Sequence, residues 1–477
     1  MRTTPTTIAA IATPPGSGGI GIIRISGPNA LAACLAVFRR HLESTPGNDG
    51  RTSVFSPASH RLYHGFAVSP KTGLLLDEVL FCYMRAPRSY TREDVAEIHC
   101  HGGPAALHQV LEAVLAAGAA PADPGEFTRR AFLNGRIDLP RAEAVIDIIQ
   151  ADHDAFLNAA ADQLRGGLSH EVAEIRQRLL GIKAEAEARI DFPDDMDEAQ
   201  WAAADIHKDL IVPIEALIRD HEERRLIRDG VRVAIIGMPN VGKSSIMNRL
   251  LRQERSIVTP VPGTTRDVVD GEFRARGLIL RVSDTAGIRD TEDPVEKIGV
   301  ERSRQAAMDA DILLVVTDAG DPSSLSICSE LSSDLHERQT GASSRKPRIV
   351  WAHNKSDLPS AATPAHPDFQ PPDASPVFVS AKTGDGMDAL SAALTDAAPS
   401  VNPGSGHRAI PNLRHARCLR TARNALLRFR DGEAGGIPPD ILMIDLREAD
   451  DALASLLGIS VADDVLDHIF SRFCIGK

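Results

Sequence analysis

The sequence predicts a multidomain chain that joins an α+β part, an all-helical part and an α/β part with a mostly parallel sheet. Over residues 1–130, short β-like runs such as 20–26 and 74–83 alternate with turns. From Arg141 onward, apolar residues recur at helical spacing. From Val231 the pattern changes to apolar runs separated by helix-length segments, which is typical of a parallel sheet covered by helices.

Length and composition indicate an ordinary globular protein. The 477 residues suggest about three domains at roughly 150 residues each. With 43% hydrophobic and 25% charged residues, the composition excludes the collagen-like and disordered classes. The 53 basic and 65 acidic residues give a net charge of −12, which argues against indiscriminate nucleic-acid binding. We also expect no membrane span, no signal peptide and, from six scattered cysteines, a cytoplasmic location.

Helical patterns lie on both sides of the α/β part. One apolar stripe over residues 164–190 predicts a long helix, which Gly166 weakens near its start. A Pro- and Gly-containing segment at 399–406 reads as a linker. Beyond it the spacing predicts two further helices, over 440–457 and 461–470.

The α/β part contains five predicted strands, at residues 231–236, 278–283, 312–317, 348–352 and 376–379. Because it lies between two helical stretches, we expect it to be inserted into one helical domain, since the ends of an inserted domain can lie close together. Three consecutive independent domains remain the alternative.

A phosphate-binding loop follows the first of these strands. Residues 237–244 (GMPNVGKS) fit the pattern G-x-x-x-x-G-K-[ST]. In such a loop the backbone N–H groups and the start of the next helix face the phosphates. Lys243 is then placed to reach the β- and γ-phosphate oxygens, and the Ser244 hydroxyl to ligate Mg²⁺.

Three companion motifs identify the nucleotide as GTP. Residues 284–287 (DTAG) end a predicted strand where a carboxylate can support the magnesium ion, and Thr264 and Thr265 lie in the loop before it. Residues 354–357 (NKSD) end another strand, and the Asp357 carboxylate can accept hydrogen bonds from the N–H groups of guanine. Residues 380–382 (SAK) follow the last strand and can contact the guanine carbonyl.

The residue that orients the attacking water in Ras-like GTPases is not present at its usual position in this sequence. Ile288 follows the DTAG motif, where Ras-like proteins carry a glutamine that orients water. The Asn240 side chain is suited to hold a monovalent cation near the phosphates. Glu296 is a candidate for positioning water, although its spacing alone favours a solvated helix residue.

Six sequence marks resemble the tRNA modification GTPases called MnmE or TrmE, of the TrmE-Era-Obg-like class of translation-factor-related GTPases. The resemblance covers essentially the whole chain. The marks are residues 13–27 (TPPGSGGIGIIRISG), 90–97 (YTREDVAE), 101–103 (HGG), 124–136 (PGEFTRRAFLNGR), 191–193 (DFP) and 473–477 (FCIGK).

The resemblance implies a domain order and a reaction. It implies an N-terminal α+β folate-binding and dimerisation domain, a helical domain in two parts, and an inserted Ras-like GTPase domain, with bounds at 1–132, 133–228, 229–400 and 401–477. It also implies a potassium-stimulated GTPase that forms a homodimer and a heterotetramer with the FAD protein MnmG (GidA). That complex adds an aminomethyl or carboxymethylaminomethyl group to C5 of the tRNA wobble uridine (position 34), using 5,10-methylene- or 5-formyl-tetrahydrofolate.

The resemblance also assigns roles by position. Glu296 matches the catalytic glutamate, Ser244 and Thr265 the magnesium ligands, and Asn240, Thr259, Val261 and Thr264 the potassium ligands. Folate-contacting positions are Arg24, Glu97, Arg136 and Lys477, and Cys474 is a candidate near the modification centre. The expected GTP-binding residues are Asn240, Val241, Gly242, Lys243, Ser244, Ser245, Thr259, Pro260, Val261, Pro262, Gly263, Thr264, Thr265, Asp284, Thr285, Ala286, Gly287, Asn354, Lys355, Asp357, Ser380, Ala381 and Lys382.

Some features depart from the family pattern or have two interpretations. Pro260 and Pro262 stiffen the potassium loop, and Pro294 lies two residues before Glu296. The seven arginines within 407–430 fit contacts with tRNA phosphates and, equally, contacts with acidic segments of the chain itself. The main alternative function is a GTP-switched ribosome-assembly factor, and a scaffold whose dimerisation is controlled by nucleotide is a third.

Overall fold

The computed structural model describes residues 6–41, 55–151, 154–191, 205–238, 240–253, 271–275, 278–284, 310–321, 347–358, 376–398 and 411–477. The chain forms two compact units. Unit 1 comprises residues 1–219 and 407–477, and unit 2 comprises residues 220–406. Unit 1 is therefore assembled from two stretches of sequence, with the whole of unit 2 between them.

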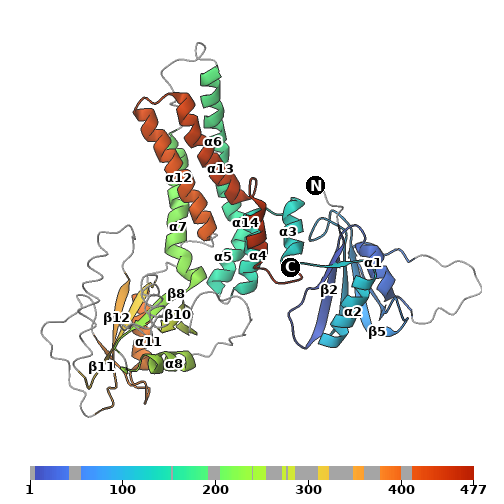
Figure 1. Ribbon diagram of the computed structural model, residues 1–477, viewed down its shortest axis with the longest axis horizontal. Helices are drawn as coiled ribbons and strands as arrows, with labels where there is room; N and C mark the ends of the chain where they lie inside the picture. The colour runs from blue at the N-terminus through green and yellow to red at the C-terminus, as the bar shows by residue number, and fades with distance from the viewer. Residues whose placement is uncertain are drawn as a thin grey trace, which may run out of the picture. The chain divides into compact units, whose positions relative to one another are not determined.

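The N-terminal part of unit 1 is a seven-stranded, mostly antiparallel sheet with the order β3-β4-β5-β6-β2-β1-β7. Helices α1 (Ala30–Val37) and α2 (Pro104–Ala116) cover one face of this sheet (Figure 1). Between sheet and helices lies an apolar core that includes Ile23, Phe81 and Val110. The strands are β1 (Ile8–Ile11), β2 (Gly18–Ser26), β3 (Phe38–Arg39), β4 (Leu62–Val68), β5 (Leu75–Met84), β6 (Val95–Gly102) and β7 (Ala120–Pro121).

The helical part of unit 1 is built around a second apolar core. Its long helices contribute Leu179, Ile214, Leu426 and Leu453, all of them buried. Burial of one stripe on each helix is what the helical spacing of apolar residues predicts. The helices are α3 (Glu126–Leu133), α4 (Leu139–Gln150), α5 (Asp154–Arg165), α6 (Gly167–Asp191), a π-helical turn (His207–Ile211), α7 (Val212–Asp229), α12 (Leu413–Ala434), α13 (Pro439–Leu457) and α14 (Asp463–Phe470). Residues 220–229 of α7 belong to unit 2.

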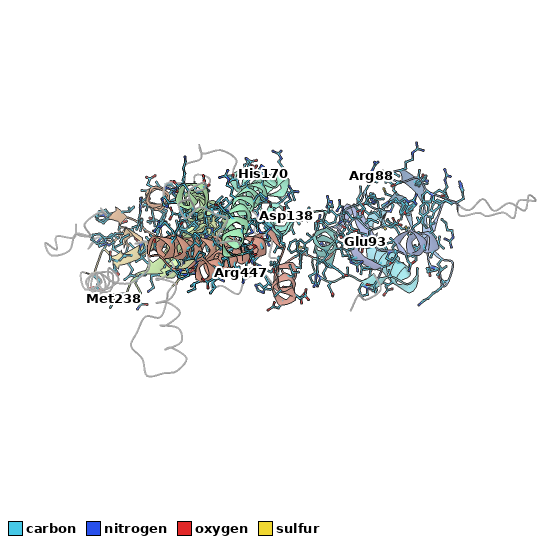
Figure 2. The ribbon with its side chains drawn as sticks, turned by 90° about the horizontal axis from the view of Figure 1, so that it is seen from above. Arg88, Glu93, Asp138, His170, Met238 and Arg447 are labelled. Carbon is cyan, nitrogen blue, oxygen red and sulfur yellow. The ribbon has the colours of Figure 1, made fainter. Side chains whose placement is uncertain are left out.

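Local capping explains where several of these helices begin and end. The Asp138 side chain, labelled in Figure 2, accepts a hydrogen bond from the Arg141 N–H and caps α4. Asn412 caps α12 in the same way. Helix α13 ends at Gly458, whose φ of +83° suits glycine and whose missing Cβ leaves room for the Phe132 ring. The same missing Cβ leaves room for Leu139, so the end of α13 can approach both the end of α3 and the start of α4.

The prediction of one long helix over residues 164–190 is wrong at its start. The helix is interrupted at Gly166, whose φ is +102°, so α5 ends at Arg165 and α6 begins at Gly167. A side chain at residue 166 would collide with the Arg141 guanidinium. The predicted stripe from Leu168 to Ala186 is confirmed, because its members are buried.

Unit 2 contains a six-stranded sheet with the order β13-β12-β11-β8-β10-β9. All neighbouring pairs are parallel except β9 with β10. Strands β8, β11 and β12 are almost wholly buried, as expected for a sheet covered on both faces. The elements are β8 (Val231–Ile236), α8 (Lys243–Gln253), β9 (Gly271–Ala275), β10 (Leu278–Asp284), β11 (Ile312–Asp318), β12 (Arg348–Asn354), β13 (Val377–Phe378) and α11 (Met387–Ala397).

The predicted fold class, with α+β, helical and mostly parallel α/β parts, is confirmed, and so are the five predicted strands of unit 2. The antiparallel edge strand β9 was not predicted. Its short run, GEFRA, has only one large apolar residue, so it lacks the continuous apolar character of the buried strands. Over the described ranges, none of the helices combines the length and the apolar character that crossing a bilayer requires.

Candidate functional site

The phosphate-binding loop lies between the end of β8 and the start of α8. Asn240 and Gly242 both adopt positive φ, +66° and +96°. A side chain at residue 242 would collide with the Asn354 amide, so only glycine fits there. Because α8 begins at Lys243, its first N–H groups face this loop. The loop therefore offers the backbone N–H donors that a phosphate group requires.

Lys243 and Ser244 stand at the first turn of α8. The Lys243 ammonium donates to the Gly237 carbonyl at 2.9 Å and to the Met238 carbonyl at 3.0 Å, and the side chain is almost fully buried. Ser244 is exposed on the same turn. A cation and a hydroxyl at the mouth of this loop are the groups that bind phosphate oxygens and Mg²⁺.

The Asn354 side chain links three loops. It bonds with the phosphate-binding loop and with the second of the two loops that are predicted to recognise guanine, and it belongs to the first of these itself. Its Nδ2 donates to the Val241 carbonyl at 2.8 Å, and its Oδ1 accepts from the Ala381 N–H at 3.1 Å. The Asn354 side chain is buried, so both bonds are shielded from water. Three predicted segments (240–245, 354–357 and 380–382) are thereby brought to one edge of the sheet.

The Asp357 carboxylate stands at this edge with room to bind a base. Its Oδ1 accepts a hydrogen bond from the buried Ser380 hydroxyl at 2.7 Å, and the residue is exposed. The Ser380 hydroxyl also accepts from the Thr383 N–H at 3.1 Å, which fixes its orientation. Lys382 is exposed beside it. A carboxylate held in this way presents acceptor oxygens to two adjacent N–H donors, as guanine offers.

Two supporting residues of this site were not predicted. The Asp318 carboxylate at the end of β11 pairs with the Lys355 ammonium at 2.6 Å, where Lys355 has a φ of +65°. From α8, the Arg249 guanidinium donates to the Thr383 carbonyl at 2.9 Å. A sequence signal existed for Asp318, since a carboxylate ends an apolar strand beside the predicted site. Arg249 carried no such signal.

Part of the predicted site lies outside the described residues or has no described side chain. The loop residues Thr259, Pro260, Val261, Pro262, Gly263, Thr264 and Thr265, the motif residues Thr285, Ala286 and Gly287, and also Pro294 and Glu296 lie outside the described ranges. Asp284 ends β10, opposite Ile235 of β8, but only its backbone is described.

The predicted folate-contacting residues converge in unit 1. Antiparallel pairing of β2 with β6 places Arg24 directly opposite Glu97. The Arg24 Nε donates to Glu97 Oε1 at 2.8 Å, and its Nη1 donates to the Gly476 carbonyl at 3.3 Å. Both charged side chains are about 15% exposed. Residues 473–477, which we call the C-terminal tail, thus contact a strand near the other end of the sequence.

The electrostatics of this cluster favour an ionised carboxylate. Burial raises the pKa of Glu97, but the hydrogen bond from His99 and the charge of Arg24 outweigh it, so the pKa lies below its ordinary value. Burial, followed by the charge of Arg24, lowers the pKa of Lys477, against an opposing effect of Glu97. A carboxylate, a guanidinium and an ammonium group therefore act on one another here.

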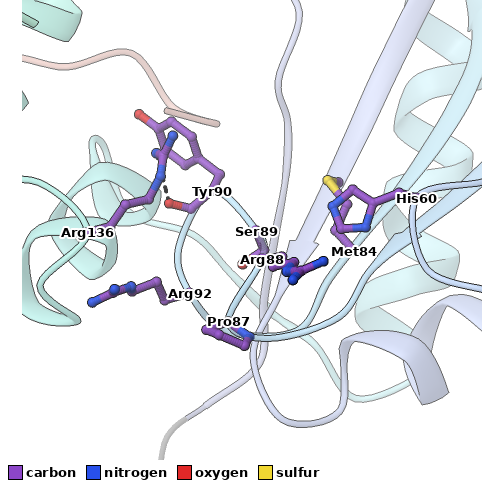
Figure 3. A pocket seen from close by; sticks show the side chains of 8 residues that line it. All are labelled: His60, Met84, Pro87, Arg88, Ser89, Tyr90, Arg92 and Arg136. Atoms are coloured by element: carbon purple, nitrogen blue, oxygen red, sulfur yellow. Dashed lines mark hydrogen bonds between the residues drawn. The ribbon is translucent and has the colours of Figure 1, made fainter. Parts of the chain in front are cut away.

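Tyr90 provides an aromatic surface between Arg24 and the fourth predicted residue, Arg136. The Arg24 guanidinium lies 5.3 Å from the centre of the Tyr90 ring and 5.8 Å from that of Phe127. The Arg136 guanidinium lies 4.7 Å from the Tyr90 ring and donates to the Tyr90 carbonyl at 3.0 Å (Figure 3). Tyr90 and Phe127 were not predicted as site residues, although both lie within the sequence marks of the family.

Comparison with known proteins identifies the family. One family model, for the N-terminus of the GTP-binding protein TrmE, matches residues 7–136, and another, for the MnmE helical domain, matches residues 139–474. The tRNA modification GTPases MnmE of Moorella thermoacetica and Geobacter sulfurreducens are 43% and 44% identical to this chain, and each alignment covers 99% of both proteins. The MnmE of Enterococcus faecalis is 40% identical over 99% of this chain and 98% of its own length. The chain belongs to the MnmE family of tRNA modification GTPases.

Membership in the MnmE family confirms the prediction of a GTPase that takes part in tRNA modification. It leaves the roles of individual residues as predictions. Cys474 is exposed in the C-terminal tail, and its carbonyl accepts a hydrogen bond from the Gly125 N–H at 3.4 Å. The exposed thiol remains a candidate at the modification centre.

The arginines within 407–430 divide into at least two groups in this MnmE-family chain. Arg414 donates from Nε and Nη2 to both oxygens of the buried Glu143, at 3.0 and 2.8 Å, and Arg428 pairs with Asp445 and Glu448. These two arginines thus contact acidic residues of the chain itself. Arg417 is exposed on α12 and is available to an anionic partner. Arg408 lies outside the described ranges.

Glu143 holds the start of α12 through a buried network. The His415 Nε2 donates to Glu143 Oε2 at 2.6 Å, while His415 Nδ1 accepts from the Asn412 N–H at 3.1 Å. Burial raises the pKa of Glu143, but His415 and Arg414 outweigh it, so the pKa lies far below its ordinary value. The network joins α4, α12 and, through Arg414, the Ser455 carbonyl near the end of α13.

Proposed function

We propose that this chain is a potassium-stimulated GTP hydrolase that acts with an FAD-dependent MnmG (GidA) partner. Together they add an aminomethyl or carboxymethylaminomethyl group to C5 of the tRNA wobble uridine, position 34. The one-carbon unit comes from 5,10-methylene- or 5-formyl-tetrahydrofolate, and FAD belongs to the partner. The observation that carries the proposal is the convergence of Arg24, Glu97 and Lys477 beside Tyr90, with Arg136 on the same ring.

The donor set of this cluster fits a folate. An ionised Glu97 can accept hydrogen bonds from the N–H edge of the pterin, and the edge of the Tyr90 ring, whose faces the Arg24 and Arg136 guanidinium groups cover, can contact a planar ring system. The Arg136 guanidinium and the Lys477 ammonium suit the carboxylates of the glutamyl end. Within the cluster, the Arg24 bond to Glu97 holds that carboxylate in place before a ligand arrives.

The nucleotide site supports the choice of GTP with Mg²⁺ and K⁺. The absence of a side chain at Gly242 lets the Asn354 amide pack against the phosphate-binding loop, and Ser244 is exposed at the start of α8. When bound, the two metal ions supply positive charge to the phosphates. We assign Mg²⁺ to Ser244 and Thr265, and K⁺ to Asn240, Thr259, Val261 and Thr264. Glu296 positions the attacking water, since Ile288 lacks any polar group for this task.

We further propose the assembly and the division of the chain. The α+β domain spans 1–132, the helical domain 133–228 and 401–477, and the GTPase domain 229–400. The chain forms a homodimer that joins MnmG in a heterotetramer. The two-segment composition of unit 1 supports the idea that the GTPase domain is inserted. The location that suits this work is the cytoplasm, where tRNA and reduced folates occur.

Mass spectrometry of wobble nucleosides tests the proposal. In cells that lack the gene, we expect loss of the aminomethyl-type C5 substituent, restored by the wild-type gene and not by Glu296→Ala. Asn424→Ala, an exposed change on α12, serves as the matched control and should restore the modification. Unaltered nucleosides in the deletion strain, with no second copy present, would favour the ribosome-assembly alternative. Ribosome profiles would then be the next measurement.

The cation proposal has a separate test with purified protein. We expect GTP hydrolysis to be faster in potassium chloride than in sodium chloride at equal ionic strength, because Asn240 is suited to hold a monovalent cation and Ile288 stands where a water-orienting glutamine is usual. Equal rates in the two salts would remove the role assigned to Asn240.

A further inference from the structure

An open basin adjoins the group formed by Arg24, Tyr90, Glu97, Arg136 and Lys477, which we call the folate cluster. Its volume is about 490 Å³, within the range of sites that hold a small organic ligand. Arg92 and Arg136 lie on one side of it and His60 and Met84 on the other (Figure 3). The lining that matters for its chemistry consists of His60, Arg88, Tyr90, Arg92 and Arg136.

The basin carries a concentrated positive charge. Its lining includes three arginines and no aspartate or glutamate. The Arg136 guanidinium donates to the Tyr90 carbonyl, and the Arg92 guanidinium donates to the Asn134 and Gly135 carbonyls at 3.0 Å. Within the described ranges, Arg88 has no side-chain partner, and none of the three arginines is paired with a carboxylate. The charges of these three guanidinium groups are therefore not neutralised by any carboxylate of the described residues. Such a group of charges forms a binding site for anions.

The basin and the folate cluster share two residues. Tyr90 contacts the Arg24 guanidinium of the cluster and the Arg136 guanidinium of the basin. Arg136 is itself a predicted folate contact and lines the basin. A ligand that binds Glu97 and passes the edge of the Tyr90 ring can therefore reach Arg136 and extend into the basin without leaving the protein surface.

We propose that the basin binds the added glutamyl residues of a poly-γ-glutamyl folate. This inference rests on the proposed folate-binding function and specifies the form of the ligand. Each γ-linked glutamate adds one α-carboxylate, and a planar guanidinium binds a carboxylate through two parallel N–H bonds. Arg88 and Arg92 thus receive the carboxylates that follow the one at Arg136. The preferred substrate is accordingly a folate with about three glutamyl residues, matching three arginines.

The shape and charge of the surroundings favour this ligand over RNA. RNA backbones are bound by basic residues spread along a surface, whereas these arginines gather in one hollow beside an aromatic ring. The chain as a whole has a net charge of −12, so the basin is a local exception. The neighbouring Glu93 is already paired with Arg130 and does not offset the basin's charge. Figure 2 labels Arg88 and Glu93 in this part of unit 1.

Binding of 5-formyl-tetrahydrofolate with one or three γ-linked glutamyl residues tests the inference. In calorimetric titrations of the full chain, we expect the triglutamyl form to bind about fivefold more tightly than the monoglutamyl form, as modest exposed ion pairs predict. Arg88→Gln should reduce this ratio to about twofold and leave the monoglutamyl Kd unchanged, which also shows that the variant is folded. Arg85→Gln, an exposed arginine outside the basin, should leave the ratio at its wild-type value.

Other outcomes separate the possible errors. Equal Kd values for the two folates in the wild type would overturn the basin assignment and leave the folate proposal intact. Failure of both folates to bind would instead refute the folate proposal itself. An equal effect of Arg85→Gln would mean that general charge, and not the basin, sets the ratio. If Arg88→Gln weakened tRNA binding while the folate ratio stayed at fivefold, the basin would serve RNA phosphates and the inference would be wrong.

Discussion

Removing the Asn354 side chain should weaken GTP binding by disconnecting two loops. Asn354→Ala deletes the bond to the Val241 carbonyl, at 2.8 Å, and the bond from the Ala381 N–H, at 3.1 Å. Val241 is buried, so water replaces the lost donor poorly. At about 1.5 kcal/mol for each bond, the total cost is about 3 kcal/mol. If the whole cost falls on the nucleotide complex, the Kd for GTP rises on the order of 100-fold.

The cost divides between binding and folding, and both parts can be measured. Bonds that persist in the free protein stabilise unit 2, and their loss lowers the free energy of unfolding instead of the GTP affinity. Titration with a fluorescent GTP analogue gives the first part. Trp351, buried in the same strand, gives the second through its fluorescence in urea, in a Trp201→Phe background that removes the other tryptophan. The sum of the two parts should be about 3 kcal/mol.

Asn424→Ala provides the matched control, because it makes the same chemical change at an exposed position of α12. It should leave both quantities unchanged. The reasoning is refuted if Asn354→Ala keeps its GTP affinity within twofold and also keeps its urea midpoint, since the two bonds would then contribute nothing in either state.

Single substitutions at Asp357, Glu143 and Glu296 test three other contacts or roles. Asp357→Asn should lower the affinity for GTP at least 100-fold and raise that for xanthosine triphosphate, because an amide donor then faces the guanine N–H groups; unchanged preference in competition titrations would contradict this. Glu143→Gln should cost about 3 kcal/mol at pH 7, because it removes the charge that pairs with Arg414 and accepts the hydrogen bond from His415. The folded pKa of Glu143 is depressed, so its contribution is fully present above the unfolded pKa of 4.5 and is lost progressively as the pH falls from there toward the folded pKa. The gap between the urea midpoints of wild type and variant should therefore narrow as the pH falls below 4.5, and a gap independent of pH would be inconsistent with this account. Glu296→Ala should keep the Kd for GTP and lose most hydrolysis in a phosphate-release assay, whereas full turnover would exclude Glu296 from the reaction.

The sequence could predict much of the nucleotide site because its residues follow strands in a fixed way. In a parallel sheet the carboxyl ends of the strands meet at one edge, so a motif after each strand arrives at the same place. Residues 240–245, 354–357 and 380–382 meet in this manner. The supporting contact from Arg249 was not predictable, because it depends on how α8 turns its polar face toward Thr383.

The contacts within the folate cluster could be predicted only from the resemblance to a family, because local sequence patterns do not state which distant residues meet. Alternation along β2 and β6 predicts strands, but the pairing that sets Arg24 against Glu97 depends on a sheet register that no local pattern states. The contact of Arg24 with Gly476 joins residues that are 452 positions apart in the sequence. No periodic pattern in the sequence indicates a contact over so long a separation. The tail is held by burial of Phe473 against Phe470 and Leu139, which lie in helices on opposite sides of unit 2 in the sequence. Both stretches of unit 1 must therefore fold together before the charges of Lys477 and Glu97 can interact. The folate cluster is thus formed by the assembled unit, and neither stretch of sequence could form it alone.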